Sequence, residues 1–156
     1  MTHNTHYNYS GDTGISGKHR ARIERDTEFI KAYRRVLELM IERGVPDARR
    51  AAIEFTVAHV QPRYHVSYDR AYNVVTEIIA GRGNPVKPSL QAQMWEEIAQ
   101  RVRQLITSKQ ISIARAVEFV LEHCRASRFF ITPDYAYHHI RRIETITKPS
   151  RHEHLN

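Results

Sequence analysis

The chain has 156 residues, 41% of them hydrophobic and 26% charged, which is enough apolar material for one compact domain or two very small ones. Lys and Arg outnumber Asp and Glu by 24 to 17, and the resulting net charge of +7 favours an anionic partner. The single cysteine, Cys124, excludes an intramolecular disulfide and a thiolate metal cluster.

Residues 1–22 are predicted to form a disordered, basic N-terminal tail, because the first seventeen are rich in Asn, Thr, Gly and Ser and show no apolar period. The basic stretch KHRARIER that follows Gly17 either extends the first helix or remains an arm. Gly44 and Pro46 are expected to end that helix. Its apolar stripe recurs at spacings of three and four residues, at Phe29, Ile30, Tyr33, Val36, Leu37, Met40 and Ile41.

A second helix is expected from about Asp47 to His59, with Ala52 and Phe55 among its core residues. Pro62 interrupts the helical pattern, and the alternating RYHV that follows indicates a short extended segment. Ser67 is expected to cap a third helix. The apolar face of that helix carries Ala71, Val75 and Ile78.

The helical pattern then starts again after a segment rich in Gly and Pro. Residues 81–89 (GRGNPVKPS) form the predicted linker. The fourth helix carries Met94, Trp95, Ile98, Val102, Leu105 and Ile106, and the fifth runs from about residue 112 to residue 124. A sixth begins at Thr132-Pro133-Asp134, where a cap, a first-position proline and a first-turn carboxylate coincide.

The second half of the chain repeats the first. Residues 52–78 align with residues 116–143 when one residue is inserted before Arg128, and nine pairs are then identical. We therefore predict an all-α fold with about six helices, built by tandem duplication of a helix–helix–turn–helix unit. The first repeat covers 23–80 and the second 90–147, packed as one body, with a C-terminal tail at 148–156. The identical pairs are Ala52/Ala116, Glu54/Glu118, Phe55/Phe119, His59/His123, Arg63/Arg128, Asp69/Asp134, Ala71/Ala136, Tyr72/Tyr137 and Ile78/Ile143.

Most of these shared residues are interpreted as scaffold. Phe55 and Phe119 are assigned to a repeated core. The residues Glu54, Arg63, Glu118 and Arg128 are assigned a structural role, because a bidentate Glu–Arg pair would hold each turn against the preceding helix.

The sixth helix, DYAYHHIRRI, is more basic than its counterpart DRAYNVVTEI. If Ala136 and Ile140 face the core, then Tyr135, His138 and Arg142 form an outward stripe that His139 and Arg141 flank. These side chains can donate to phosphate or read base edges. The alternative is a solvated helix face whose late charges suit the helix dipole.

The leading hypothesis is a nucleic-acid-binding protein, with duplex DNA as the expected ligand. The connection before each third helix is longer than a helix–turn–helix allows, so only a related helical arrangement is expected. The competing hypothesis is a protein-interaction or structural module, with an acidic protein as partner, and homo-oligomerisation stays open. The predicted nucleic-acid contacts are Tyr135, His138, His139, Arg141, Arg142, Lys148, Arg20, Arg22, Arg49 and Arg50.

Enzymatic chemistry is not expected, because the sequence contains no GxxxxGK[ST], GxGxxG or GxSxG pattern. Ten histidines are present, yet none is spaced as HExxH or as a Cys/His ligand set, so no catalytic residue, metal or cofactor is predicted. Without a membrane-length apolar run or a signal-peptide core, the expected location is the cytoplasm, with no membrane contact.

Overall fold

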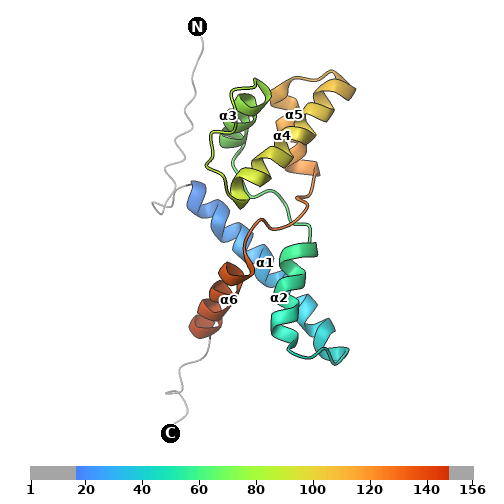
Figure 1. Ribbon diagram of the computed structural model, residues 1–156, viewed down its shortest axis with the longest axis vertical. Coiled ribbons are helices and arrows are strands. Elements are labelled where there is room, and N and C mark those ends of the chain that lie inside the picture. The colour runs from blue at the N-terminus through green and yellow to red at the C-terminus, as the bar shows by residue number, and fades with distance from the viewer. Residues whose placement is uncertain (1–16, 148–156) are drawn as a thin grey trace.

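The computed structural model describes residues 17–147, and within this range the protein is all-helical, as predicted (Figure 1). Residues 1–16 and 148–156, which include Lys148 and most of the two predicted tails, lie outside the described residues. None of the helices in the described range is both long and apolar enough to cross a membrane. The six helices are α1 (Gly17–Glu42), α2 (Ala48–His59), α3 (Tyr68–Ile79), α4 (Leu90–Lys109), α5 (Ile113–His123) and α6 (Pro133–Thr147).

Helix α1 begins earlier than the expected tail allowed, since residues 17–22 are already helical. Lys, Arg and Ala are strong helix formers, so this basic stretch continues the helix towards the N-terminus. At the other end Gly44 adopts a φ of 68°. The N–H of Val45 then donates to the carbonyl of Met40 at 2.9 Å and closes the last turn, which confirms the predicted stop.

Side-chain hydroxyls cap the starts of α3 and α6, as predicted for Ser67 and Thr132, whereas Asp47 makes no such bond at the start of α2. Ser67 accepts from the N–H of Arg70 at 3.2 Å, and Thr132 accepts from the N–H of Tyr135 at 3.1 Å. The same bond recurs at the start of α4 and α5, with Ser89 and Ser112 as acceptors. Each cap satisfies a backbone donor that the first helical turn leaves without a partner.

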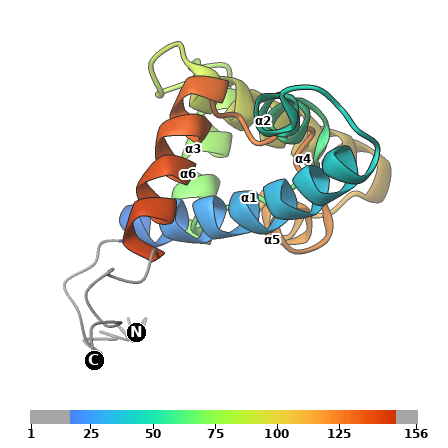
Figure 2. The ribbon, with the colours of Figure 1, turned by 90° about the horizontal axis from the view of Figure 1, so that it is seen from below.

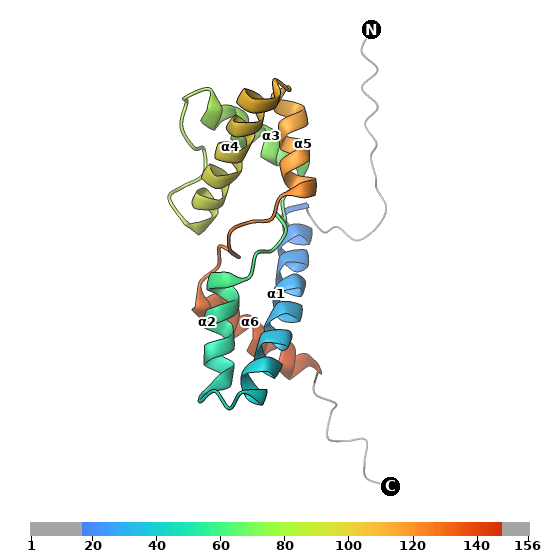
Figure 3. The ribbon, with the colours of Figure 1, turned by 90° about the vertical axis from the view of Figure 1, so that its right-hand side faces the viewer.

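The helices pack as two three-helix bundles that exchange their third helices. Helix α3 packs against α4 and α5, whereas α6 packs against α2 and shares a core with α1. Figures 1 and 3 show the two bundles at opposite ends of the molecule, joined by the extended segments before α3 and α6. In Figure 2, α6 lies across the N-terminal part of α1. Because neither α3 nor α6 packs mainly on the helix before it, the helix–turn–helix-like arrangement does not form among the described residues.

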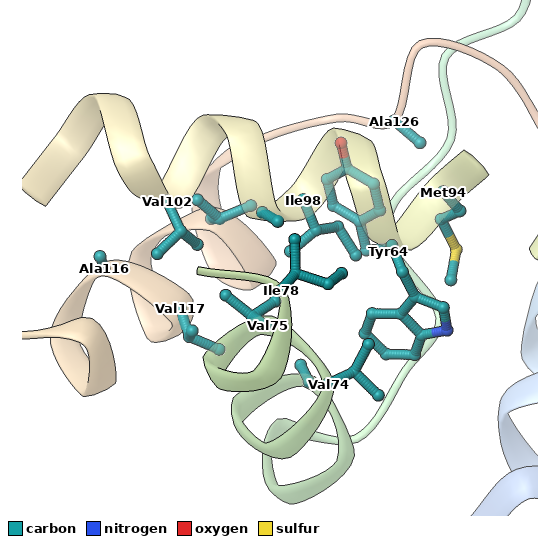
Figure 4. Close-up of a cluster of buried hydrophobic side chains, with 14 of the residues drawn as sticks. Tyr64, Val74, Val75, Ile78, Met94, Ile98, Val102, Ala116, Val117 and Ala126 are labelled. Atoms are coloured by element: carbon teal, nitrogen blue, oxygen red, sulfur yellow. The ribbon is translucent and has the colours of Figure 1, made fainter. Parts of the chain in front are cut away.

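Each bundle has its own apolar core. The core of α3, α4 and α5 surrounds Val75, Ile98, Val102 and Val117, all fully buried (Figure 4). The core of α1, α2 and α6 contains Phe29, Ile30, Tyr33, Ala52, Ile53, Val57, Phe129, Ile131, Ala136 and Ile140.

The two segments that carry the third helices cross each other between the bundles. Residues 60–67 and 124–132 pair in antiparallel fashion at Arg63 and Arg125, and the N–H of Ala126 donates to the carbonyl of Pro62 at 2.7 Å. Tyr64 enters the core of α3, α4 and α5, while its aligned residue Phe129 enters the other core. The extended segment expected after α2 is confirmed, and it leads into the opposite bundle.

Two residues assigned to the repeated core are not in it. Phe55 and Phe119 are each 44% exposed, although Ala52 and Ala116, three residues earlier, are fully buried. Each helix buries the face that holds the alanine, and the phenylalanine lies beyond its edge. The core assignment of this pair was therefore wrong.

Candidate functional site

A cationic groove of about 590 Å³ lies between the two bundles. Its walls are the first turns of α1, the two crossing segments, the start of α3 and the residues that lead into α4. No carboxylate from residues 17–147 lines it. The basic side chains that line it are Lys18, Arg22, Arg25, Arg63, Arg70, Lys87 and Arg128.

Local structure explains how these cations converge. Lys18, Arg22 and Arg25 follow one another at spacings of four and three, so they occupy one face of α1. Arg70 belongs to the first turn of α3, behind the Ser67 cap that also lines the groove. Because the N-termini of α3 and α4 both meet the groove, their backbone dipoles add to its positive potential.

Several of these cations have no ionic partner among the residues that the structure describes. Within residues 17–147, no carboxylate pairs with the side chains of Lys18, Arg22, Arg63, Arg70 or Lys87. Charges that are not neutralised by the protein are available to an anionic ligand.

The other two basic residues of the groove make contacts of their own. The Arg25 guanidinium donates to Asp26 Oδ1 at 3.0 Å, and the Arg128 guanidinium donates to the Gln93 side chain. Arg128 also lies over the ring of Phe130, with its Cζ 4.9 Å from the ring centroid. The ion pair with Asp26 offsets the charge of Arg25, whereas the contacts of Arg128 orient its charge without neutralising it.

Tyr135 and His139, both predicted as nucleic-acid contacts, help to hold α6 on α1. The Tyr135 hydroxyl donates to the buried Asp26 Oδ2 at 2.8 Å and accepts from Arg25 at 3.0 Å. Burial, and then the bond to Asp26, raise the pKa of Tyr135 above its ordinary value. The His139 ring stacks on Tyr135 and places Nε2 3.6 Å from Asp26 Oδ2.

Three further predicted contacts on α6, His138, Arg141 and Arg142, are exposed. They lie outside the cationic groove, and Arg142 donates to Nδ1 of His139 at 3.2 Å. Arg22 connects the two sets, because it lines the cationic groove and also a neighbouring pocket that contains His138 and Arg142.

Of the predicted contacts on α1 and α2, most also lie outside the cationic groove. Arg49 pairs with Glu144, and this bond raises the pKa of its guanidinium. Arg50 pairs with Glu54 at 3.2 Å. Arg20 is exposed on α1, and Arg22 alone of the predicted contacts in the described range lines the cationic groove.

The Glu–Arg pairs expected to hold each turn do not form. Glu54 bonds to Arg50, and Arg128 bonds to Gln93. In the first turn it is the backbone N–H of Arg63 that meets a carboxylate, that of Glu28, at 2.8 Å. Because each crossing segment turns towards the opposite bundle, its arginine faces the groove and not the preceding helix.

The sequence did not predict that these basic side chains meet in one groove. Lys18, Arg25, Arg70 and Lys87 lie on three separate segments, and no local pattern connects them. The available signal was the identity of Arg63 and Arg128 in the two aligned segments, which we assigned to stability.

Comparisons with known proteins do not identify the site. No protein-family model matches the chain, and searches of curated proteins and of solved structures gave no significant match. Residues 17–147 also contain no group of three side chains placed to hold a metal ion.

Proposed function

We propose that the protein binds nucleic acid through its phosphates, with the cationic groove as the principal contact. The observation that carries this proposal is the meeting of seven basic side chains in one groove that no described carboxylate lines. Phosphate contacts from Arg and Lys supply most of the affinity of nucleic-acid-binding proteins. A net charge of +7 adds long-range attraction to the same ligand.

Tandem duplication of the helix–helix–turn–helix unit is part of this proposal. It is supported by the nine identical aligned pairs, by the hydroxyl caps on both third helices, and by crossing segments that meet in antiparallel fashion. Duplication explains why Arg63 and Arg128 enter one groove from two directions.

The test of the groove uses a charge-reversed variant, Arg70→Glu with Lys87→Glu. Neither side chain has an ionic partner in the described range, so the melting temperature should change little. Binding of a labelled oligonucleotide, followed by fluorescence anisotropy at constant salt, should weaken by at least about tenfold.

The matched control is Arg34→Glu with Arg35→Glu. It changes the net charge by the same amount, on an exposed part of α1 that lies roughly 24 Å along the helix from Lys18. The control should bind nearly as well as the wild type. Equal losses in both variants would mean that net charge, and not the groove, determines binding.

The exposed cations of α6 are proposed as a second contact. Arg141→Glu with Arg142→Glu should weaken oligonucleotide binding without lowering the melting temperature, because both side chains are exposed. Unchanged affinity in that variant would remove α6 from the binding surface.

A second candidate function, binding of a protein partner, is favoured by one specific observation. Phe55 and Phe119 are identical, equally exposed, and tilted against His59 and His123 at centroid distances of 4.9 and 4.8 Å. A scaffold does not require exposed phenylalanines, so their presence in both halves favours two equivalent docking positions. The partner would present the same apolar epitope twice and gain affinity by bivalent binding.

The substitutions Phe55→Ala and Phe119→Ala separate this function from nucleic-acid binding. Nuclease-treated pull-downs should recover less partner with each single variant and none with the double variant, while oligonucleotide affinity stays unchanged. Equal recovery with the double variant would exclude this surface.

A further inference from the structure

The cationic groove adjoins a second basic pocket on helix α1. This α6 pocket, of about 450 Å³, lies where α6 crosses the N-terminal turns of α1 (Figure 2). His138 and Arg142 line it from α6. Arg22 lines both the groove and the α6 pocket. The N-terminal turns of α1 therefore form a ridge with basic side chains on each flank.

The spacing of residues along α1 explains why the two pockets adjoin at this ridge. Ala21 and Arg25, four residues apart, line the groove on one face of the helix. Ile23 and Thr27, also four apart, line the α6 pocket on the next face. The side chain of Arg22 lies between these faces and is exposed. Positive charge thus continues from one pocket to the other.

A third pocket also adjoins the groove, along residues 65–67, but it is acidic. Arg20 and Arg63 line this pocket together with three carboxylates. The carboxylates are those of Glu24, Glu118 and Glu122. Carboxylates repel an anionic ligand, so the favourable way out of the groove leads across Arg22 and not past Arg20.

The two neighbouring arginines of α6 have different surroundings. Arg142 lines the α6 pocket, where the one carboxylate among the described residues is that of Asp26. Asp26 is 5% exposed and is already bonded to Arg25 and Tyr135. Arg141 instead lines a pocket between α2 and α6 that is rich in carboxylates. The carboxylates there are those of Asp47, Glu54, Asp134 and Glu144.

From this arrangement we propose that one nucleic-acid ligand occupies the groove and the α6 pocket together and crosses α1 at Arg22. Its phosphates contact Arg70 in the groove, Arg22 on the ridge and Arg142 in the α6 pocket. Crossing a helix of about 10–12 Å diameter takes roughly three nucleotides at about 3.4 Å per phosphate, so the ligand must be extended. This inference rests on the proposed function and specifies the path of its ligand.

The test uses the full-length protein and a labelled fifteen-nucleotide oligonucleotide, supplied as a single strand and as a blunt duplex. The form that binds the wild type more tightly is used for all variants, by fluorescence anisotropy at one salt concentration. Arg22→Glu and Arg142→Glu should each weaken binding by at least about fivefold. Both side chains are exposed, so the melting temperature should change little. Where it falls, the glutamine variant, which only removes the charge, is compared in the same way.

Each variant has a matched counterpart on the same helix. Arg20→Glu and Arg141→Glu change the net charge by the same amount, beside pockets that contain several carboxylates. Each should weaken binding at least about threefold less than its counterpart in the path. Arg34→Glu, on the exposed part of α1, should leave the affinity unchanged.

Inorganic triphosphate tests whether the ligand must be extended, because it is too short to reach from the groove to the α6 pocket. Used as a competitor, it should show the same inhibition constant with the wild type and with Arg142→Glu. Its inhibition constant should rise in Arg70→Glu with Lys87→Glu. A weaker effect of triphosphate on Arg142→Glu would contradict a path with two separate ends.

The outcomes separate the inference from the proposed function. Equal affinities of Arg142→Glu and Arg141→Glu, with binding lost in Arg70→Glu with Lys87→Glu, would confine the ligand to the groove. That result would overturn the path across α1 and leave nucleic-acid binding standing, as would equal losses in Arg22→Glu and Arg20→Glu. Failure of both forms of the oligonucleotide to bind the wild type would overturn the proposed function as well.

Discussion

Asp26 is the residue on which the contact between α1 and α6 depends most. It is 5% exposed, yet its carboxylate is compensated by Arg25, by the Tyr135 hydroxyl and by the nearby His139 ring. A charge that is buried with several donors is tolerated, whereas a donor left without its acceptor is costly.

We expect Asp26→Ala to lower the free energy of unfolding by about 2–4 kcal/mol, because it leaves Arg25 and the Tyr135 hydroxyl without their acceptor. Urea denaturation measures the change. Asp134→Ala, which removes an exposed carboxylate from the first turn of α6, should cost less than about 1 kcal/mol. Similar losses in the two variants would contradict the importance of the Asp26 network.

Tyr64 gives the protein a predictable sensitivity to alkaline pH. Burial raises the pKa of Tyr64 above its ordinary value of 10.0. Above about pH 10 the unfolded chain releases this proton while the native chain keeps it, so stability falls as the pH rises. Tyr64→Phe should make that fall shallower, as shown by melting temperatures between pH 9 and 11.

The aligned position supports the choice of phenylalanine, since Phe129 is buried in the other core. Between pH 7 and 9 the wild type and Tyr64→Phe should show the same pH dependence of stability. An unchanged alkaline slope in the variant would mean that Tyr64 ionises equally easily in the folded protein.

At the scale of the helices, local sequence signals were sufficient to predict where each helix lies. They did not predict which helices pack against one another. Apolar spacing and the Ser67 and Thr132 caps predict where helices lie, because each signal is contained within one or two turns. The exchange of α3 and α6 leaves no such signal. Ala71 and Ala136 are fully buried, and they would be so in whichever bundle received their helix.

The candidate site was harder to predict for the same reason. Arg22 was identified from its local charge, whereas Arg70 and Lys87 become part of the groove only through the crossing of residues 60–67 and 124–132. Phe55 was misplaced because a phenylalanine beside a buried alanine has the sequence character of a core residue. A residue at the edge of the apolar face of a helix is buried only if another helix packs beside it.

The exchange predicts that half of the chain will not fold alone. A fragment of residues 17–88 contains α1, α2 and α3, but α6 is missing from the first core and α3 has lost α4 and α5. We expect no cooperative thermal transition from a monomeric fragment, measured by circular dichroism with light scattering. A monomer that melts cooperatively would show that α3 can replace α6 within its own half.

At the scale of the whole molecule, the proposed nucleic-acid binding should weaken as salt is added. For single strands, log K falls with log salt by about 0.7 for each phosphate contact. Arg70→Ala with Lys87→Ala should therefore make the slope shallower by about 1.4, as measured by anisotropy between 50 and 200 mM salt. An unchanged slope would place these two side chains away from the phosphates.

The crossing of the two extended segments has a consequence for synthesis on the ribosome. Helices α1 and α2 emerge first, but the helix that completes their core is the last of the described elements to be made. Meanwhile α3 must await the two helices that follow it. The core of α1 and α2 therefore stays open until α6 has been made, whereas α3, α4 and α5 can pack together before it.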